Sequence, residues 1–389
     1  MKKIAYITSL PTPYRTPLLA RIAKNPDIDL KVFYCSASAP SREWELTLGE
    51  TAHFSEILPG KTIHVPFINI ESKINSSVLR KLKEGKFDCL IIGGYNHLTM
   101  IIAIFWAVLN KVPYLLSSES HLLNKRKPWK NLLKSLFVGL IVRKASAYLP
   151  TGKFAGEYFI NYGAETNRIF YFPNTPDVQF FLDETNKYRE KKNSIKEELE
   201  IPNKIIIFFS GRLIKVKGVF TLLKAFKIVK EEFKNVSLLL AGNGILREEL
   251  ENFVTGNKID DVLFAGFTKP EILPKYYAIA DIFVLPSNHE PWGVVVNEAM
   301  ASGLPIVLSD KVGARGDLLE EEKNGFCFES GNYRELARVF KLMLSNPEKL
   351  IEMGKRSKEI IKKHDYSYCE ENLKKALELI FNRAHTKEK

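Results

Sequence analysis

The stretch from Asp281 to Asp317 constrains the fold of this chain more than any other part of the sequence. Apolar runs with β-branched residues, separated by proline and glycine, indicate alternating strands and helices. The expected elements are a strand over 281–285, a loop over 286–292, a helix over 293–302 and a second strand over 305–309. Such a unit belongs to an open α/β sheet, which binds ligands at the carboxyl ends of its strands. The loop is therefore a candidate ligand-binding segment.

Two glutamates, eight positions apart in the sequence, lie at the carboxyl edge of the expected sheet. Glu290 lies in the loop, and Glu298 lies on the early turns of the helix. The helix begins near Gly293, where backbone N–H groups and the positive end of the helix dipole favour an anion such as a diphosphate. Most glutamates are simply solvated. Beside a diphosphate, however, these two carboxylates would accept hydrogen bonds from the hydroxyl groups of a sugar and a ribose.

The surrounding residues resemble the E-x7-E signature of the retaining glycosyltransferases of family 4, which have the GT-B fold. The resemblance is carried by 288–293 before the helix and 298–305 at its end. It implies that Glu290 holds donor sugar hydroxyls and that Glu298 holds the ribose. The N–H groups that would help to bind the diphosphate are those of Gly293, Val294 and Val295.

A basic turn follows the first strand of the second half. Arg212 and Lys217 stand in the sequence Ser210–Gly218, between a strand pattern and a helix pattern, so they emerge at the same edge as Glu290. Arginine can bind phosphate oxygens through two N–H groups, and lysine adds a compact charge. Solvated cations are the usual alternative. The turn matches the R-x4-K phosphate clamp of the family, which implies stabilisation of the departing nucleoside diphosphate without a metal.

Two glycines follow the expected strand over 236–241, and an aromatic residue follows the expected strand over 262–265. Gly242 and Gly244 supply half of a G-x-G-x-x-G motif, and Arg247 occupies the third glycine position, so the dinucleotide fingerprint is incomplete. The two glycines indicate either close backbone approach around a nucleotide or a simple strand-to-helix turn. Phe267 follows the next strand, where the resemblance implies contact with the base.

The first half is expected to hold the acceptor. Tyr14 and Arg15 lie in a proline-rich loop after the first strand, and similar P-Y-R-x-P strings occur in some relatives. Arg15 is a candidate ligand of a phosphate, with a structural salt bridge as the alternative. His97 follows another strand at this edge. The family often places a histidine after the strand over 112–116, and in this chain either Glu119 or His121 takes that place.

The strand and helix patterns alternate through both halves of the 389-residue chain, which predicts an α/β fold with two Rossmann-like, doubly wound parallel-sheet domains facing a central cleft. The expected strands are 3–9, 29–35, 88–93, 112–117, 145–150 and 168–172, then 204–209, 236–241, 262–265, 282–285 and 306–308. The expected domains are 1–185 for the acceptor, a charged linker over 186–203, 204–365 for the nucleotide sugar, and a C-terminal helix over 366–389 that packs back on the first domain.

The composition indicates a globular protein with basic character. The net charge is +12, which favours phosphorylated substrates, an anionic membrane surface or nucleic acid as partners. The basic and apolar segment over 124–137 is either a solvated loop and core helix or a peripheral membrane contact. No signal peptide or spanning segment is evident, the four cysteines form no C-x-x-C pair, and a cytoplasmic location is expected. The D-x-D string at 27–29 is a turn signal, so no metal and no cofactor are expected.

The resemblance therefore implies a retaining hexosyltransferase that uses a UDP- or GDP-sugar and a glycan or lipid-linked acceptor, in cell-surface polysaccharide synthesis. Three alternatives share some of these features. They are a nucleotide-sugar epimerase or glycan phosphorylase of the same architecture, a dinucleotide oxidoreductase, and a basic module that binds membrane or nucleic acid.

Overall fold

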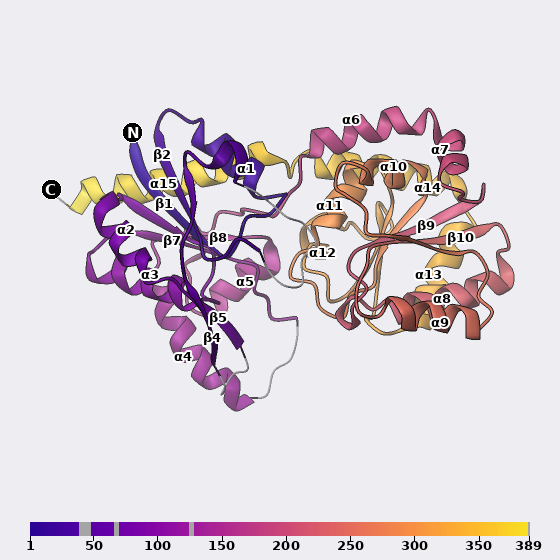
Figure 1. The fold of residues 1–389 in the computed structure, drawn as a ribbon, viewed down its shortest axis with the longest axis horizontal. Coiled ribbons are helices and arrows are strands. Elements are labelled where there is room, and N and C mark those ends of the chain that lie inside the picture. The colour runs from indigo at the N-terminus through magenta and orange to yellow at the C-terminus, as the bar shows by residue number, and fades with distance from the viewer. Residues whose placement is uncertain (39–47, 66–69, 124–127, 388–389) are drawn as a thin grey trace. The chain divides into compact units, whose positions relative to one another are not determined.

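The computed structural model describes residues 1–38, 48–65, 70–123 and 128–387. The chain forms two compact units (Figure 1). Unit 1 comprises Met1–Asn174 and Tyr366–Lys389, and unit 2 comprises Thr175–Asp365. Each unit contains a six-stranded, fully parallel sheet, which confirms the predicted α/β class.

The sheet of unit 1 has its first strand near the centre. In spatial order its strands are β3 (Ser55–Ile57), β2 (Ile28–Tyr34), β1 (Lys2–Thr8), β6 (Cys89–Ile92), β7 (Tyr114–Ser118) and β8 (Ala147–Pro150). A separate antiparallel pair, β4 (Lys61–Val65) and β5 (Ile70–Ile74), was not predicted from the sequence. The segment 168–172, predicted as a strand, contributes one isolated bridge at Ile169.

Helices bury both faces of this sheet (Figure 1). One apolar cluster joins the sheet to α2 (Ser77–Gly85), α3 (Leu98–Leu109), α4 (Pro128–Lys144) and α5 (Lys153–Asn161). A second cluster joins the opposite face to α1 (Thr16–Ala23) and α15 (Tyr366–Lys387). The strands are buried on both faces, which explains their nearly continuous apolar sequences.

The sheet of unit 2 repeats the same topology. In spatial order its strands are β11 (Val262–Gly266), β10 (Val236–Ala241), β9 (Ile205–Ser210), β12 (Ile282–Leu285), β13 (Ile306–Ser309) and β14 (Gly325–Phe328). Counted within each unit, the order is 3-2-1-4-5-6, that of doubly wound nucleotide-binding sheets. The direction of winding reverses between the first and fourth strands. The expected ligand positions are therefore the loops after β1 and β6 in unit 1 and after β9 and β12 in unit 2.

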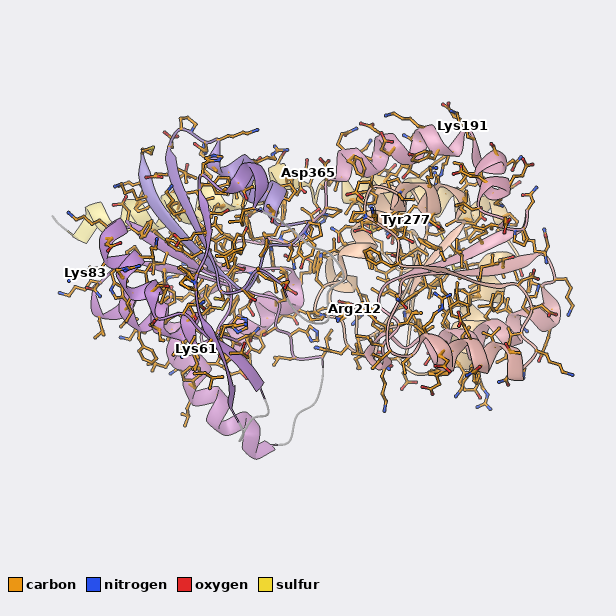
Figure 2. The ribbon with its side chains drawn as sticks, viewed as in Figure 1. Lys61, Lys83, Lys191, Arg212, Tyr277 and Asp365 are labelled. Carbon is orange, nitrogen blue, oxygen red and sulfur yellow. The ribbon has the colours of Figure 1, made fainter. Side chains whose placement is uncertain are left out.

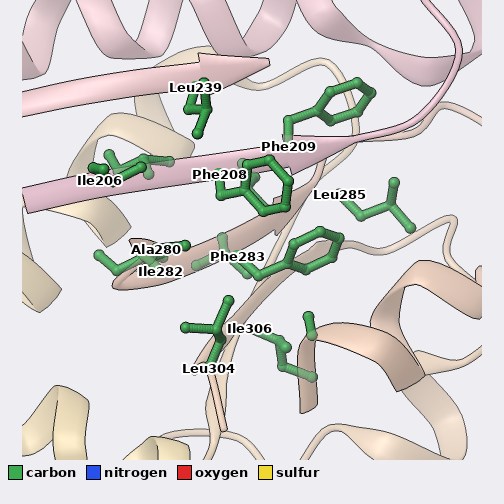
Figure 3. Close-up of a cluster of buried hydrophobic side chains, with 14 of the residues drawn as sticks. Ile206, Phe208, Phe209, Leu239, Ala280, Ile282, Phe283, Leu285, Leu304 and Ile306 are labelled. Atoms are coloured by element: carbon green, nitrogen blue, oxygen red, sulfur yellow. The ribbon is translucent and has the colours of Figure 1, made fainter. Parts of the chain in front are cut away.

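The core of unit 2 lies between two helical layers (Figure 1). One layer contains α8 (Val219–Glu232), α9 (Arg247–Gly256) and α13 (Tyr333–Leu344). The other contains α6 (Val178–Arg189), α7 (Lys192–Glu198), α10 (Leu273–Ile279), α11 (Val294–Ala301) and α14 (Pro347–Ile361). Figure 3 shows Phe208 of β9 and Phe283 of β12 side by side in this core. Their ring centroids lie 6.3 Å apart in an edge-to-face arrangement, and this contact joins β9 to β12 at the switch point.

The predicted linker over 186–203 is folded in the structure. The end of α6 and the whole of α7 occupy most of it, and both helices belong to unit 2. Its charges are used structurally: Lys192 forms an ion pair with Asp281 at 2.7 Å, and buried Lys196 donates to the carbonyl of Lys204 at 2.8 Å. The segment thus belongs to unit 2, and the chain passes between the units at Asn174.

We predict that Phe283→Ala destabilises unit 2 by about 3–5 kcal/mol, because the substitution leaves a cavity where the ring is fully buried between strands and helices. Chemical denaturation of the full chain, followed by tryptophan fluorescence, measures the effect. Ile351→Ala on the exposed side of α14 is the control, with an expected change within about 0.5 kcal/mol. Equal effects of the two substitutions would contradict the proposed packing.

Candidate functional site

The switch point of unit 2 brings opposite charges together. Lys217 ends a 3-10 helix, η3 (Lys215–Lys217), in the turn after β9, and Glu290 lies in the loop after β12. The Lys217 ammonium and the Glu290 carboxylate form an ion pair, and each side chain retains only 14% of its accessible surface. The sequence predicted that both residues would lie at this edge. The structure places them in direct contact.

Backbone hydrogen bonds fix the position of Glu290. Its N–H donates to the carbonyl of Lys311 at 3.1 Å, and its own carbonyl accepts from the N–H of Gly313 at 2.9 Å. The hydroxyl of buried Ser287 lies 3.5 Å from the carboxylate. The glutamate is therefore held by the loop after β13 as well as by its own loop, and such fixed carboxylates are suited to orienting a ligand.

Arg212 also lies at the carboxyl edge of this sheet (Figure 2). It is partly exposed, and the next residue, Leu213, is fully buried and anchors the turn. The N–H of Leu213 donates to the carbonyl of Asn243 at 2.8 Å, which links the loops after β9 and β10. The guanidinium is thus carried by a fixed turn at the same edge as Lys217.

Glu298 lies on α11 against a buried tyrosine. The hydroxyl of Tyr277, on α10, donates to Oε2 of Glu298 at 2.8 Å. Figure 2 shows Tyr277 among the helices that cover this side of the sheet. Burial raises the pKa of Glu298 to about 7, and the tyrosine hydrogen bond partly opposes that rise. The carboxylate therefore titrates near neutral pH. The sequence did not single out Tyr277, because a tyrosine in an apolar helix has the pattern of a core residue.

The start of α11 depends on a glycine. Gly293 adopts φ +100°, a left-handed conformation that side chains rarely accept, immediately before the first helical residue, Val294. This turn directs the first N–H groups of the helix to the carboxyl edge of the sheet, where they have no acceptor within the helix. Val294 and Val295 are both partly exposed, so this helix end is accessible within unit 2.

The two glycines after β10 have a structural role. A Cβ on Gly242, at φ +141°, would lie 1.9 Å from the carbonyl oxygen of Gly211, and a Cβ on Gly244 would lie 2.5 Å from that of Leu213. Both glycines therefore allow the loops after β9 and β10 to pack closely. Their contact with a nucleotide stays a prediction. Phe267 follows β11 and exposes 46% of its surface, which leaves its ring open to a ligand.

In unit 1, Arg15 lies in a buried polar chain. Its guanidinium donates to the side-chain oxygen of Asn174 and lies 4.6 Å above the ring of Phe172. The amide of Asn174 donates to Glu119 at 2.6 Å. Of the two candidates after β7, Glu119 is thus connected to Arg15. Asn174 was missed from the sequence because it lies far from both partners and belongs to no recognisable motif.

The other candidates of unit 1 also follow strands at the carboxyl edge. Nδ1 of His121 accepts from the N–H of Leu123 at 3.3 Å. His97 precedes α3, and its Nδ1 accepts from the N–H of Lys73 at 3.2 Å. Burial, with a contribution from the Lys73 charge, lowers the pKa of His97, so the imidazole is neutral at pH 7. Tyr14 is partly exposed beside Arg15.

The described side chains and helices bear on metal binding and on membrane spanning. Within the described residues, no group of three or more histidine, cysteine, aspartate or glutamate side chains is arranged to hold a metal ion. Among the described helices, none has the length and hydropathy that crossing a bilayer requires. The membrane hypothesis for 124–137 begins on residues 124–127, which lie outside the described part of the chain.

The fold identifies the class of the protein as GT-B. HepE of Anabaena, solved in complex with UDP and glucose, superposes with a TM-score of 0.73 over 97% of this chain and 99% of its own, at 20% sequence identity. The likeness confirms the predicted fold: two parallel-sheet α/β domains in one chain.

Sequence comparison finds relatives of the second half of the chain. Residues 190–360 match the model of the family of glycosyl transferases group 1. Spore coat protein SA of Bacillus subtilis is 35% identical over 183 residues, which is 45% of this chain and 48% of that protein. The match thus spans about half of this relative's length. An uncharacterized glycosyltransferase of Methanocaldococcus jannaschii is 24% identical over 82% of this chain and 96% of its own.

The raised pKa of Glu298 predicts a pH-dependent stability. The pKa of Glu298 in the folded state lies above the ordinary 4.5. The contribution of this carboxyl group to the free energy of unfolding is therefore complete below about pH 4.5 and is lost as the pH rises through about 7. Glu298→Gln stays neutral, so we expect it to gain thermal stability relative to wild type at pH 8 but not at pH 4.5. Melting temperatures at both pH values test this. Exposed Glu352→Gln should show no such difference.

Proposed function

We propose that the protein is a retaining hexosyltransferase of family 4. It would transfer a hexose from a UDP- or GDP-sugar to a hydroxyl group of a glycan or lipid-linked acceptor in cell-surface polysaccharide synthesis. The observation that carries the proposal is the Lys217–Glu290 ion pair at the switch point of unit 2, within a domain of the glycosyl transferases group 1. The UDP and glucose bound by HepE, a protein of the same fold, support a nucleotide-sugar donor.

The charges of unit 2 suit the departure of a nucleoside diphosphate. As the bond between the anomeric carbon and the phosphate oxygen breaks, negative charge grows on the diphosphate. Arg212, Lys217 and the first N–H groups of α11 would stabilise that charge more in the transition state than in the ground state. Lys217 is held by Glu290 in the structure, so donor binding would share this cation between the carboxylate and the diphosphate.

The two glutamates would orient the donor. Glu290, fixed by its backbone hydrogen bonds, would accept hydrogen bonds from sugar hydroxyls. Glu298 would accept from the ribose, and Tyr277 would hold its carboxylate in position. Gly242, Gly244 and Phe267 would lie around the nucleotide. Polar groups aligned in this way reduce the entropy lost on reaching the transition state.

Unit 1 would bind the acceptor. The Arg15–Asn174–Glu119 chain places a buried cation and an exposed carboxylate at the edge of its sheet, and Tyr14, His97 and His121 follow strands at the same edge. A phosphate-bearing acceptor would match the cation. We further propose that the enzyme needs no metal or other cofactor, is cytoplasmic, and contacts the anionic inner face of the membrane.

The first functional prediction concerns the ion pair. We expect Lys217→Ala to lower kcat for sugar transfer by roughly 10²–10³, as for removal of a group that stabilises an oxyanion. Glu290→Gln should also lower kcat. Lys215→Ala, in the same turn but exposed, is the matched control and should remain near wild type. Initial rates with a panel of UDP- and GDP-sugars are the measurement, and wild-type rates in both Lys217→Ala and Glu290→Gln would refute the roles.

The second functional prediction concerns the reaction type. We expect the rate to be unchanged by excess EDTA, because fixed cations replace the metal, and we expect the product to keep the anomeric configuration of the donor. Proton NMR of the product gives the configuration. Rates measured with and without an acceptor distinguish transfer from epimerisation, since an epimerase would convert the donor without any acceptor.

A further inference from the structure

The start of α11 has a glycine where a capping side chain would ordinarily stand. A serine, threonine or aspartate at the N-cap would accept a hydrogen bond from the second or third N–H group of the helix and so occupy it. Gly293 is the N-cap residue here and has no side chain to do this. The N–H of Val296 donates to the carbonyl of Gly293 at 2.9 Å. The N–H groups open to a ligand are therefore those of Val294 and Val295, which have no acceptor within the helix.

Trp292 and Asn297 form a staple across this helix start. Trp292 precedes the N-cap residue, and Asn297 is the fourth residue of the helix. The indole Nε1–H of Trp292 donates to Oδ1 of Asn297 at 3.1 Å. Residues at these two positions commonly pack against each other and fix the angle at which the chain enters a helix. In this protein a hydrogen bond adds a fixed direction to that contact, and we call the pair the Trp292–Asn297 staple.

The staple is closed to any ligand. Trp292 exposes 2% of its surface and Asn297 exposes none. Nδ2 of Asn297 is also buried and has no hydrogen-bond partner among the described residues, a state that costs free energy. An apolar residue of similar size would avoid this cost, so stability alone does not account for an asparagine at this position. Because neither side chain can touch a substrate, the pair can act only through the groups beside it.

Those groups are the two parts of the candidate donor site. The Glu290 carboxylate stands two residues before Trp292, and the N–H groups of Val294 and Val295 begin two residues after it. The carbonyl of Trp292 accepts from the N–H of Ala314 at 3.0 Å, so the tryptophan is held by the loop after β13 as well as by α11. Loss of the indole hydrogen bond would release the turn that lies between the carboxylate and the N–H groups.

We propose that Asn297 is a positioning residue of the donor site. Through Trp292 it fixes the turn at Gly293, and with it the distance between the Glu290 carboxylate and the first N–H groups of α11. The helix start is thus held without a cap that would compete with the diphosphate for those N–H groups. Donors fixed in this way need little reorganisation as charge develops, and a displacement of about 1 Å can lower a rate by roughly 10². The inference rests on the proposed function for the identity of the ligand.

Two variants separate positioning from stability. Asn297→Leu leaves the indole N–H of Trp292 buried without a partner, so we expect a lower melting temperature and a kcat for sugar transfer lowered roughly 10–100-fold. Adding Trp292→Phe removes both partners, and the leucine takes up part of the volume that the smaller ring leaves. Replacing both partners by apolar groups recovers much of the stability. We therefore expect the double variant to regain most of the melting temperature and to keep the lowered kcat, with a smaller change in KM for the donor.

The matched control lies at the other end of the same helix. The hydroxyls of Thr185 and Ser302 form a hydrogen bond at 3.0 Å, and both residues are fully buried. Thr185→Val combined with Ser302→Ala also replaces both partners of a buried hydrogen bond, and we expect its kcat to equal that of wild type. Recovery of the wild-type kcat in the double variant of the staple would overturn the proposal, because the hydrogen bond would then serve stability alone.

Hydrogen exchange of the full chain, measured by mass spectrometry without any ligand, tests the staple apart from the reaction. We expect faster exchange over residues 286–296 in Asn297→Leu and in the double variant of the staple, and unchanged exchange there in the control. Equal exchange in wild type and in the double variant would overturn the proposal. A wild type that transfers no sugar from any donor, with exchange changed as expected in the variants, would support the staple and refute the proposed function.

Discussion

The pairing of β9 with β12 is the constraint on which the candidate site depends. These are the first and fourth strands of their sheet, where the direction of winding reverses, and the loops that follow them touch: the N–H of Asn288 donates to the carbonyl of Val216 at 2.7 Å. Phe208 and Phe283 join the two strands within the core, and Lys217 and Glu290 join the loops that follow the strands. The ion pair and the aromatic contact in the core thus both depend on the same two strands.

The positions of the candidate donor residues in the fold could largely be predicted from the sequence, because these residues lie within short distances of recognisable strands and turns. Glu290, Glu298, Arg212 and Lys217 all follow or accompany elements whose periodicity is clear. The direct contact between Lys217 and Glu290 could not be predicted, since it depends on the strand order. Tyr277 was not found for a related reason: its hydroxyl reaches Glu298 only because α10 and α11 pack on one face of the sheet.

The first unit was less predictable. Its short antiparallel pair and the edge strand β3 carry weak patterns, and part of the sequence around them lies outside the described residues. The connection of Arg15 with Glu119 through Asn174 joins three segments that are far apart in the sequence. The segment over 186–203 is highly charged, and lysine and glutamate are as frequent on the surface of a packed helix as in a connection between domains. Charge density alone does not distinguish a packed helix from a connection between domains.

The return of the chain to unit 1 has a consequence for how the protein is made. Helix α15 supplies Cys369, Leu373 and Ala376 to the cluster that also contains Ile4 and Val32, and these residues are almost completely buried. On the ribosome, residues 1–174 emerge before this helix, so one face of their sheet is covered by α1 alone until α15 has been made. The second unit, which is continuous in sequence, can assemble in the meantime. Unit 1 is therefore completed only after unit 2 has been made, and in the interval the part of its sheet that α15 covers is available to chaperones.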